Sequence, residues 1–394
     1  MKLIFLFIFS SFLFSCSFQQ KAPGNSGLKA SLTKVMNRSA KQYEYFATTI
    51  PEGLFPKTFQ NNKLVTCKSS DWVSGFYPGT LLYLSEFLND DGLFKLAEAK
   101  LNVLQKEQFN TRTHDLGFMM FNSFGNALRI KPDRKYEEII LNSAKSLASR
   151  YSPVVKAIRS WDSAPDDFLV IIDNMMNLEL LFWATRFSGD SSFYKIAVEH
   201  ANTTLKNHFR KDYSTYHVVN YDPVKGSVKE KKTHQGAFDE SSWARGQAWA
   251  LYGYTLMHKE TGDRKYLDLA NNIASLILLH PSMPEDGIPL WDFDTPQEAG
   301  DYKDASAGAI IASALIELAK YAPLKQRNYI KRAEFILSSL STPPYFASYK
   351  TNGGFLLKHS VGHLPRNSEV DVPLTYADYY FVKAICRYFE RDKK

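Results

Sequence analysis

One carboxylate lies inside a long apolar, helix-forming run. Asp173 falls within Leu169–Ala184, with Asn174 and Asn177 beside it. Burying an unpaired charge is costly, so such an aspartate is normally paired, protonated or at a cavity rim, where a raised pKa suits an acid. The two amides could orient its carboxyl group without neutralising it. The alternative is a helix N-terminal aspartate that accepts backbone N–H groups.

Polar and aromatic residues cluster where other apolar helical stretches begin. The clusters are Asp71–Gly79, His114–Phe118, Ile172–Asn174, Ser242–Trp249, Asp304–Gly308 and Tyr376–Tyr379. Asp115 supplies a second carboxylate. Trp72, Trp243 and Trp249 offer flat faces on which sugar rings stack, and Arg245 offers a fork for a carboxylate. Alternatively each tryptophan is core and Arg245 pairs with a buried aspartate. Taken together, the set predicts a carbohydrate pocket with two carboxylates.

The periodicity predicts the elements that hold these residues. About twelve stretches place apolar residues at helical spacing. They are Ser31–Thr48, Gly79–Leu88, Leu93–Glu107, Leu116–Ile130, Tyr136–Ser149, Asp167–Phe187, Ser192–His208, Ser242–Thr261, Arg264–Leu279, Ala305–Tyr321, Gln326–Leu340 and Tyr376–Arg391. Strand-like alternation is confined to places such as Thr215–Val219 and Gly354–Leu357. The chain is therefore expected to be all-α.

The helical stretches alternate in character. One set has a single apolar stripe and should lie outside, and the other is apolar nearly all round and should lie inside. Such outer–inner pairs form an internal repeat, which either stacks as an open solenoid or closes on itself. The irregular spacing favours a closed (α/α)6 six-hairpin barrel. In that barrel the N-terminal ends of the inner helices share one face, so the polar clusters converge on one pocket.

The N-terminus indicates export. Met1–Ser15 has a lysine and then an apolar core too short to span a bilayer, as in a signal peptide. Ser15 and Cys16 resemble a bacterial lipobox, which would make Cys16 the lipidated first residue of a membrane-anchored lipoprotein; cleavage and release is the alternative. Residues 16–28 are expected to form a flexible tether, and residues 29–394 a single catalytic domain.

Composition excludes several other classes. Cys67 and Cys386 do not make a disulfide scaffold, and no Cys/His spacing is typical of a zinc site. The net charge is +7, and removal of Met1–Ser15 takes away only Lys2, which leaves +6. This mild basicity suits an acidic substrate, although the charges are dispersed as on a solvated surface. No nucleic-acid-binding motif is present.

Several motifs, in their order and spacing, resemble one enzyme family. They are Trp72–Gly79, His114–Phe118, Ile158–Asp162, Ile172–Leu178, Thr233–Gly236 and Trp243–Trp249. They resemble the unsaturated glucuronyl hydrolases, glycoside hydrolase family 88, over nearly the whole mature chain. That family has an (α/α)6 barrel, in agreement with the periodicity. Asp304–Ala307 departs from the family-like Asp-Ser-Ser-Ala pattern.

The resemblance implies an unusual hydrolysis. Its substrates would be oligosaccharides on which a polysaccharide lyase has left a 4,5-unsaturated uronic acid at the non-reducing end, so the enzyme acts downstream of a lyase. It hydrates the vinyl ether instead of displacing at the anomeric carbon. Asp173 would be the general acid/base, and Asp115 the second essential carboxylate. No metal or organic cofactor is implied, and the parent polymer, glycosaminoglycan or ulvan among others, stays open.

Further positions follow from the same resemblance. Trp72, Trp161, Trp243 and Trp249 would shape the sugar site, and His114, His217, Gln235 and Arg245 would bind hydroxyl, carboxylate or sulfate groups. Arg366 and Ser368, in the loop Gly362–Asp371, are candidates for recognising sulfation on the next sugar. An exposed loop with one arginine is otherwise just a loop, and a lone histidine such as His217 can be structural.

Three alternatives remain. The first is a rhamnogalacturonyl-type hydrolase of family 105 on the same barrel. The second is a saturated-glycan hydrolase or a sugar epimerase, and the epimerase would depend on paired histidines instead of Asp115 and Asp173. The third is a glycan-binding surface lipoprotein without turnover, which the presence of both aspartates disfavours.

Overall fold

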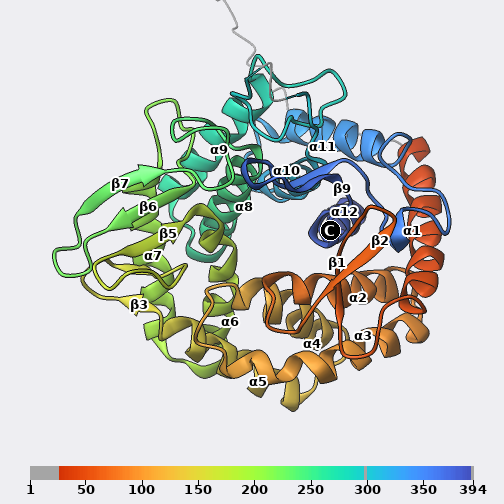
Figure 1. Cartoon of the computed structure of the whole chain (residues 1–394), viewed down its shortest axis with the longest axis horizontal. Helices are drawn as coiled ribbons and strands as arrows, with labels where there is room; N and C mark the ends of the chain where they lie inside the picture. Colours follow the sequence, from red (N-terminus) through yellow and green to blue (C-terminus); the bar gives the residue numbers. More distant parts are fainter. Residues whose placement is uncertain (1–25, 297–299, 392–394) are drawn as a thin grey trace, which may run out of the picture.

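The chain folds into two concentric rings of helices. This computed structural model describes residues 26–296 and 300–391. The outer ring consists of α1 (Ser26–Ala47), α3 (Asp91–Leu104), α5 (Arg134–Ala148), α7 (Ser191–His208), α9 (Arg264–Leu279) and α11 (Gln326–Leu340). The inner ring consists of α2 (Phe76–Leu88), α4 (Asn126–Ile130), α6 (Leu178–Ser188), α8 (Ala244–Thr261), α10 (Ala305–Leu318) and α12 (Thr375–Glu390). Figure 1 looks down the barrel, with α12 near its centre.

The inner ring is closed. α12 packs against both α10 and α2, so the last inner helix meets the first. Every residue of α10 is buried, whereas α5 buries one stripe that includes Tyr136, Ile140 and Ala144. Apolar residues on all sides therefore produce the inner helices, and single stripes the outer ones. The predicted closed (α/α)6 barrel is confirmed, and the open solenoid is not found.

Two inner segments begin irregularly. The helix predicted from Asp167 is wrong at its start: Phe168–Ile171 is strand β5, and the 3₁₀ helix η4 (Ile172–Asn177) leads into α6. A short buried apolar run of this kind does not distinguish strand from helix by periodicity. Before α4, the π-helix η3 occupies Gly117–Gly125. Wide turns of this kind are frequent at functional sites.

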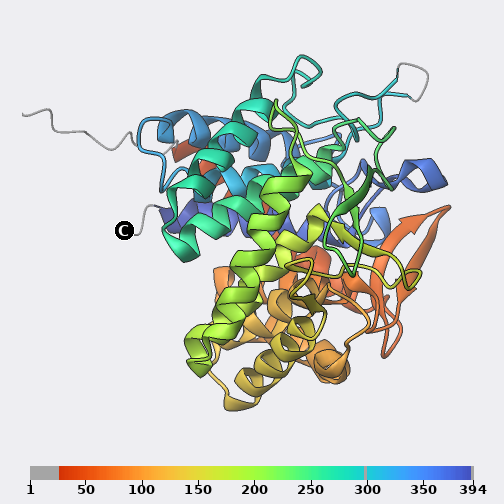
Figure 2. The ribbon, with the colours of Figure 1, turned by 90° about the vertical axis from the view of Figure 1, so that its left-hand side faces the viewer.

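The short sheets collect at one end of the barrel (Figure 2). β1 (Phe55–Gln60) pairs with β2 (Lys63–Cys67), and β3 (Tyr151–Ser152) with β4 (Ala157–Ile158). β5 joins β6 (Val218–Tyr221) and β7 (Val228–Lys232), and β8 (Ser360–His363) pairs with β9 (Ser368–Val372). The strand expected at Thr215–Val219 overlaps β6, while the one at Gly354–Leu357 forms only an isolated bridge at Leu357. The C-terminal end of α12 lies at the opposite end.

The expected export segment and Cys16 lie outside the described residues. α1 begins at Ser26, so the last three residues of the predicted tether, 26–28, are helical. None of the helices in the described ranges combines the length and apolarity that a bilayer crossing requires. Cys67 is partly exposed and Cys386 is buried, and no disulfide joins them.

Candidate active site

Asp173 stands where a strand becomes a helix. β5 ends at Ile171, whose backbone is extended, and the first turn of η4 carries Asp173, which is 9% exposed. The neighbouring amides hold other segments instead of its carboxyl group. Asn174 Nδ2 donates to Ile158 O at 2.9 Å, and Asn177 Oδ1 accepts from Phe118 N at 3.0 Å. The two asparagines therefore fix the loops around Asp173.

Asp115 is fixed by its own loop. Thr113 Oγ1 donates to Asp115 Oδ2 at 2.9 Å, and His114 Nε2 lies 3.4 Å from Asp115 Oδ1. Gly117, two residues after Asp115, packs against the segment that carries Asp173, because a Cβ atom there would lie 2.5 Å from Asn177 Cα. This close approach ties the two aspartate loops together.

Burial makes both carboxyls weak acids. It raises the pKa of Asp173 to about 7; the Arg245 charge opposes this shift, and the Asp115 charge adds to it. Burial likewise raises the pKa of Asp115 to about 7, against the hydrogen bond from Thr113. Each can therefore hold a proton near neutral pH, as general acid catalysis requires.

The environment of His217 determines where its proton lies. Nδ1 accepts hydrogen bonds from the backbone N–H groups of His234 and Gln235, both at 3.2 Å. The proton of the neutral ring is therefore on Nε2, which lies 3.7 Å from Asp173 Oδ2. Burial, followed by the charges of His234 and Arg245, keeps the pKa of His217 well below its ordinary value. His217 thus turns an N–H toward Asp173. His114 is also neutral, because burial lowers its pKa to about 3.

The four tryptophans divide into two pairs. Trp243 and Trp249 are buried, 2% and 0% exposed, and pack under the site. The ring of Trp243 lies 4.5 Å from that of His217. Trp72 and Trp161 are partly exposed. Because only the second pair keeps accessible faces, Trp72 and Trp161 are the candidates for stacking on sugar.

Arg245 joins segments of the barrel. Its Nη1 donates to Asp304 Oδ2 at 2.9 Å and to Val361 O, and its Nη2 donates to Gly362 O at 2.8 Å. Asp304 also caps α10, since its Oδ1 accepts from Ser306 N at 3.0 Å. Arg245 therefore pairs with a buried aspartate, as in the alternative considered from the sequence. Its positive charge also acts on the carboxyl group of Asp173.

A second aspartate of the sequence clusters is structural. Asp378 accepts hydrogen bonds from the backbone N–H groups of Leu356 and Leu357 and from the Tyr43 hydroxyl, each at 2.9 Å. It holds the loop before β8 against α1. The clusters at Asp304 and Asp378 thus support the barrel without pointing carboxylates at the site.

The sequence did not single out His234 and His363. Their rings lie 4.6 Å apart, and His234 also packs 5.1 Å from Trp161. The charge of Arg366 contributes to lowering the pKa of both histidines, although burial is the larger cause. His234 lies directly before Gln235 in the motif Thr233–Gly236, and that position could have identified it from the sequence as a candidate site residue.

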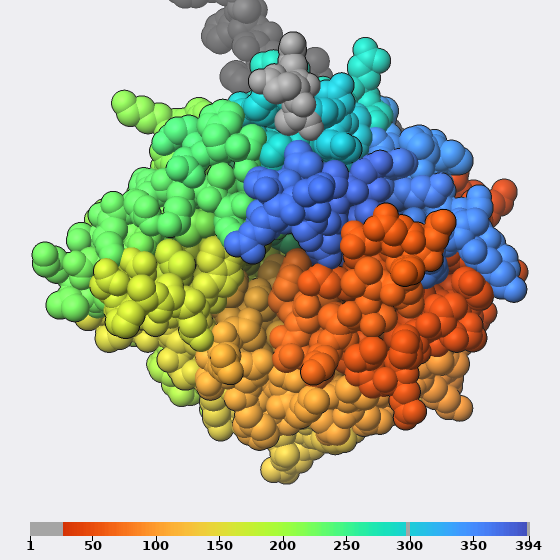
Figure 3. Space-filling view, viewed as in Figure 1, coloured from red at the N-terminus to blue at the C-terminus, as the bar shows by residue number. Residues whose placement is uncertain are grey.

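The β8–β9 hairpin brings the remaining candidates to the rim. Gln235 Nε2 donates to Gly362 O at 2.8 Å, and Arg366 and Ser368 are exposed at the turn. Figure 3 shows a hollow near the centre of this face, where green, blue and orange segments meet. In residues 26–296 and 300–391 there is no group of three His, Cys, Asp or Glu side chains arranged to hold a metal.

A closed (α/α)6 barrel with one buried and one partly buried carboxylic acid, and with tryptophan faces at its mouth, defines a carbohydrate-processing enzyme. The model of the Glycosyl Hydrolase Family 88 matches residues 51–383. The chain belongs to glycoside hydrolase family 88. This match favours the first prediction from the motifs over the family 105 alternative.

Individual relatives agree with the family match. An unsaturated glucuronyl hydrolase of Formosa agariphila is 48% identical over 323 residues, 81% of this chain and 80% of that protein. An unsaturated chondroitin disaccharide hydrolase of Streptococcus agalactiae is 30% identical over 373 residues, 92% of each. The crystal structure of an unsaturated glucuronyl hydrolase specific for heparin is 45% identical, with a TM-score of 0.90 over 94% of this chain and 99% of that chain.

Proposed function

We propose that this glycoside hydrolase removes 4,5-unsaturated uronic acid from the non-reducing end of oligosaccharides released by polysaccharide lyases. The observation that carries the proposal is the state of Asp173. Burial raises its pKa to about 7, and its Oδ2 has no hydrogen-bond partner among the described residues. A protonated carboxyl with one free oxygen is suited to give a proton to a substrate atom.

The proposed reaction hydrates the vinyl ether. Protonated Asp173 gives its proton to C4, so the double bond becomes a C4–H bond and the positive charge is shared by C5 and the ring oxygen. Ionised Asp173 then takes a proton from a water molecule as its oxygen bonds to C5. The resulting hemiketal opens, and the rearranged uronate separates from the remaining sugar. His217 Nε2–H lies 3.7 Å from Asp173 Oδ2, beyond hydrogen-bond distance, so its dipole favours the carboxylate between the two proton transfers without occupying that oxygen.

The rim favours an anionic sugar next to the uronate. Arg366 is exposed at the β8–β9 turn. Its charge, after burial, contributes to lowering the pKa values of His234 and His363. Ser368 stands beside this group, paired across the hairpin with His363. We therefore place sulfated products, of glycosaminoglycan or ulvan type, ahead of neutral ones as substrates. The charge of +6 on the chain without Met1–Ser15 supports the same choice.

The test follows the ultraviolet absorbance of the conjugated double bond in lyase digests of several uronic polysaccharides. Wild type should bleach at least one digest, and Asp173→Asn should lose roughly 10³-fold or more in kcat, since the acid and base are the same group. Asp268→Asn, on the outer helix α9 and 61% exposed, is the matched control and should retain activity. A folded wild type that binds digests without bleaching any would support the glycan-binding alternative instead.

We further propose that the chain is exported and anchored to a membrane through a lipid on Cys16. The apolar segment Leu3–Phe14 and the Ser15-Cys16 pair support this proposal. Cells fed a radiolabelled fatty acid should label the wild-type protein and not Cys16→Ala. Equal labelling of the two, or secretion of unlabelled wild type, would contradict the anchor.

A further inference from the structure

A second cavity lies inside the barrel, toward the end where the inner helices finish. Its volume is about 510 Å³, within the usual range for small-molecule sites. Each inner helix contributes to its wall: Tyr83 of α2, Asn126 of α4, Glu179 of α6, Lys259 of α8, Glu317 of α10 and Lys383 of α12. Neither Asp115 nor Asp173 lines it. The rings of Trp249 and Tyr380, 5.3 Å apart, lie between Asp173 and Lys383.

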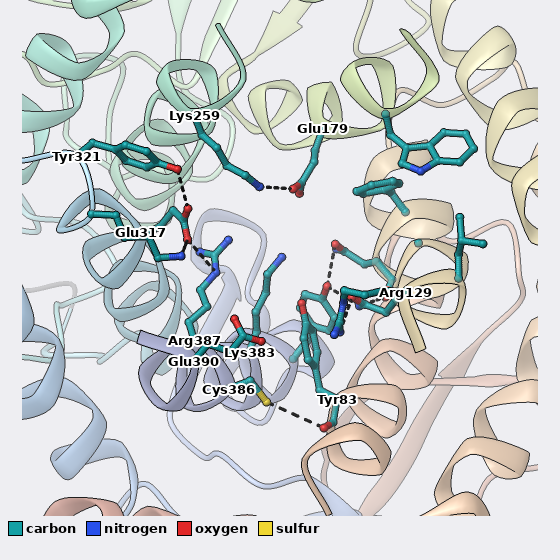
Figure 4. A pocket seen from close by; sticks show the side chains of 18 residues that line it. Tyr83, Arg129, Glu179, Lys259, Glu317, Tyr321, Lys383, Cys386, Arg387 and Glu390 are labelled. Carbon is teal, nitrogen blue, oxygen red and sulfur yellow. Dashed lines mark hydrogen bonds and ion pairs between the residues drawn. The ribbon is translucent and has the colours of Figure 1, made fainter. Parts of the chain in front are cut away.

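The most distinctive group in this cavity is the ammonium of Lys383. The residue is 7% exposed, and its side chain extends into the cavity (Figure 4). No hydrogen bond or ion pair joins its Nζ to another residue of the described chain. The nearest stabilising groups are the rings of Tyr252, Tyr379 and Tyr380, whose centroids lie 5.2, 5.5 and 5.9 Å away.

Two of the carboxylates in the wall, Glu179 and Glu317, are already paired with other cations. Glu179 lies 3.4 Å from Lys259 Nζ, and Glu317 lies 2.7 Å from Lys320 Nζ and 3.9 Å from Arg387 Nε. Burial, reinforced by the charge of Arg387, lowers the pKa of Lys383 to about 7. The charge of Glu179 opposes this shift, and Glu390 also lines the wall, but neither carboxylate forms an ion pair with Lys383 in the described part of the chain.

Helix dipoles do not account for Lys383. Cations in the last turn of a helix are stabilised by its negative end, and Lys259 and Arg387 occupy such positions. Lys383 lies about two turns before the end of α12, beyond the reach of that effect. A buried cation without a partner is costly to maintain, and an anionic ligand would provide the missing hydrogen bonds.

We propose that this cavity binds a small acidic sugar whose carboxylate or sulfate group pairs with Lys383. The aromatic faces of Tyr83, Trp183 and Tyr321 and the amide of Asn126 supply the apolar and polar surfaces that a sugar ring requires. The site is separate from the one that carries the proposed hydrolysis, so it stands or fails independently of that activity.

The test is calorimetric binding at pH 6 with four probes: D-glucuronate, N-acetylglucosamine 6-sulfate, D-glucose and sodium sulfate. One or both acidic sugars should bind, and the one that binds identifies the anionic group. Glucose and inorganic sulfate should bind at least tenfold more weakly. Absence of binding by both acidic sugars, or equally tight binding of sulfate ion or glucose, would overturn the proposal.

Substitutions distinguish binding in this cavity from binding in the candidate active site at Asp115 and Asp173. Lys383→Met should weaken binding of the acidic sugar by roughly 10- to 100-fold, the usual effect of losing a charged hydrogen bond. The exposed Lys331 on α11 provides the control, since Lys331→Met should bind as the wild type does. Unchanged binding by Lys383→Met would assign the sugar to the candidate active site and overturn the proposal.

Stability provides a second measurement in the absence of ligand. Because the Lys383 ammonium makes no hydrogen bond, Lys383→Met should melt at the same temperature as the wild type or higher. A marked loss of stability would show that the ammonium is structural, and would also overturn the proposal.

Discussion

Asp173 and Asp378 are alike in burial and different in bonding. Burial raises the pKa of each to about 7. Asp378 accepts three hydrogen bonds at 2.9 Å, whereas Asp173 Oδ2 accepts none from the described residues. A buried acceptor without partners lowers stability and remains available to a substrate. This contrast separates the proposed catalytic acid from a structural aspartate.

The first prediction concerns the pH dependence of stability. The folded state binds the Asp173 proton more tightly than the unfolded state, whose pKa is near the ordinary 3.8. The contribution of this group is therefore fully present below about pH 4 and is lost as pH rises through about 7. Asp173→Asn removes this titration. Its free energy of unfolding, measured by denaturant titration, should exceed that of wild type by a few kcal/mol at pH 8. At pH 4 the two free energies should be nearly the same.

Asp378→Asn is the matched variant for that measurement. An amide at this position cannot accept all three hydrogen bonds, so the variant should lose about 1–3 kcal/mol of unfolding free energy at pH 4, where both aspartates are protonated. The loss should be smaller at pH 8, because the amide also removes the titration of Asp378, whose pKa burial raises to about 7. If both variants lost stability equally at pH 4, the distinction between the two aspartates would be wrong.

A second prediction concerns Arg245. Its ion pair with Asp304 is buried, with the side chains 1% and 0% exposed, so Arg245→Met should cost about 3–5 kcal/mol of stability. Because the Arg245 charge lowers the pKa of Asp173, its removal should also move the alkaline limb of kcat/KM to higher pH. Arg245→Lys, which keeps the charge, should keep the limb. A rise in KM alone, with stability and pH profile unchanged, would mean that Arg245 simply binds substrate.

Residue types alone predicted the environment of the proposed acid but not every neighbour. An aspartate in an apolar run predicts burial and a raised pKa, and Asp173 has both. The contacts of Asn174 and Asn177 with distant loops could not be derived, since nothing local shows where Ile158 or Phe118 will lie. His234 and His363 were missed for the same reason: their pair joins the loop after β7 to the end of β8, which are far apart in sequence.

Among the elements, the contact of η3 with η4 controls the distance between the two aspartate loops. A third prediction is that Gly117→Ala lowers activity by roughly tenfold or more and also lowers stability, since its Cβ would lie 2.5 Å from Asn177 Cα and force the loops apart. Gly308→Ala, in α10, is the control. The tightest contact of its Cβ would be with the flexible end of Ile288 at 3.1 Å, so activity should stay near the wild-type value. Steady-state kinetics and thermal melting would measure both effects.

The predictability of elements followed the strength of their periodicity. Outer helices such as α9 and α11 were predicted to the residue because each has one clear stripe and a polar face. The sequence of β5 predicts a helix, because a short buried apolar run shows neither a clear helical period nor the alternation of a strand. Only its pairing with β6 reveals the strand. The π-helix at η3 was predicted as an ordinary helix, since the wider turn depends on the tertiary contact at Gly117.

At the scale of the whole molecule, the ring brings the two described ends together. Lys29 of α1 lies 5.6 Å from the ring centroid of Phe389 in α12. A fourth prediction is that a circular permutant, with residues 391 and 26 joined by a short flexible linker and new ends in the exposed turn at Gly189–Asp190, folds and remains active. Circular dichroism and the absorbance assay would test it. A permutant opened inside α8, whose residues up to Met257 are almost all buried, should not fold.

The β1–β2 hairpin has a consequence for the timing of synthesis. Thr58 forms a bridge with Leu374, and its hydroxyl donates to Pro373 O at 2.7 Å, so one of the earliest segments docks on one of the last. On the ribosome, the chain must emerge almost completely before this contact can form. The mouth of the active site is therefore completed at the end of translation, and a nascent chain that lacks its final fifty residues has both aspartates but no finished site.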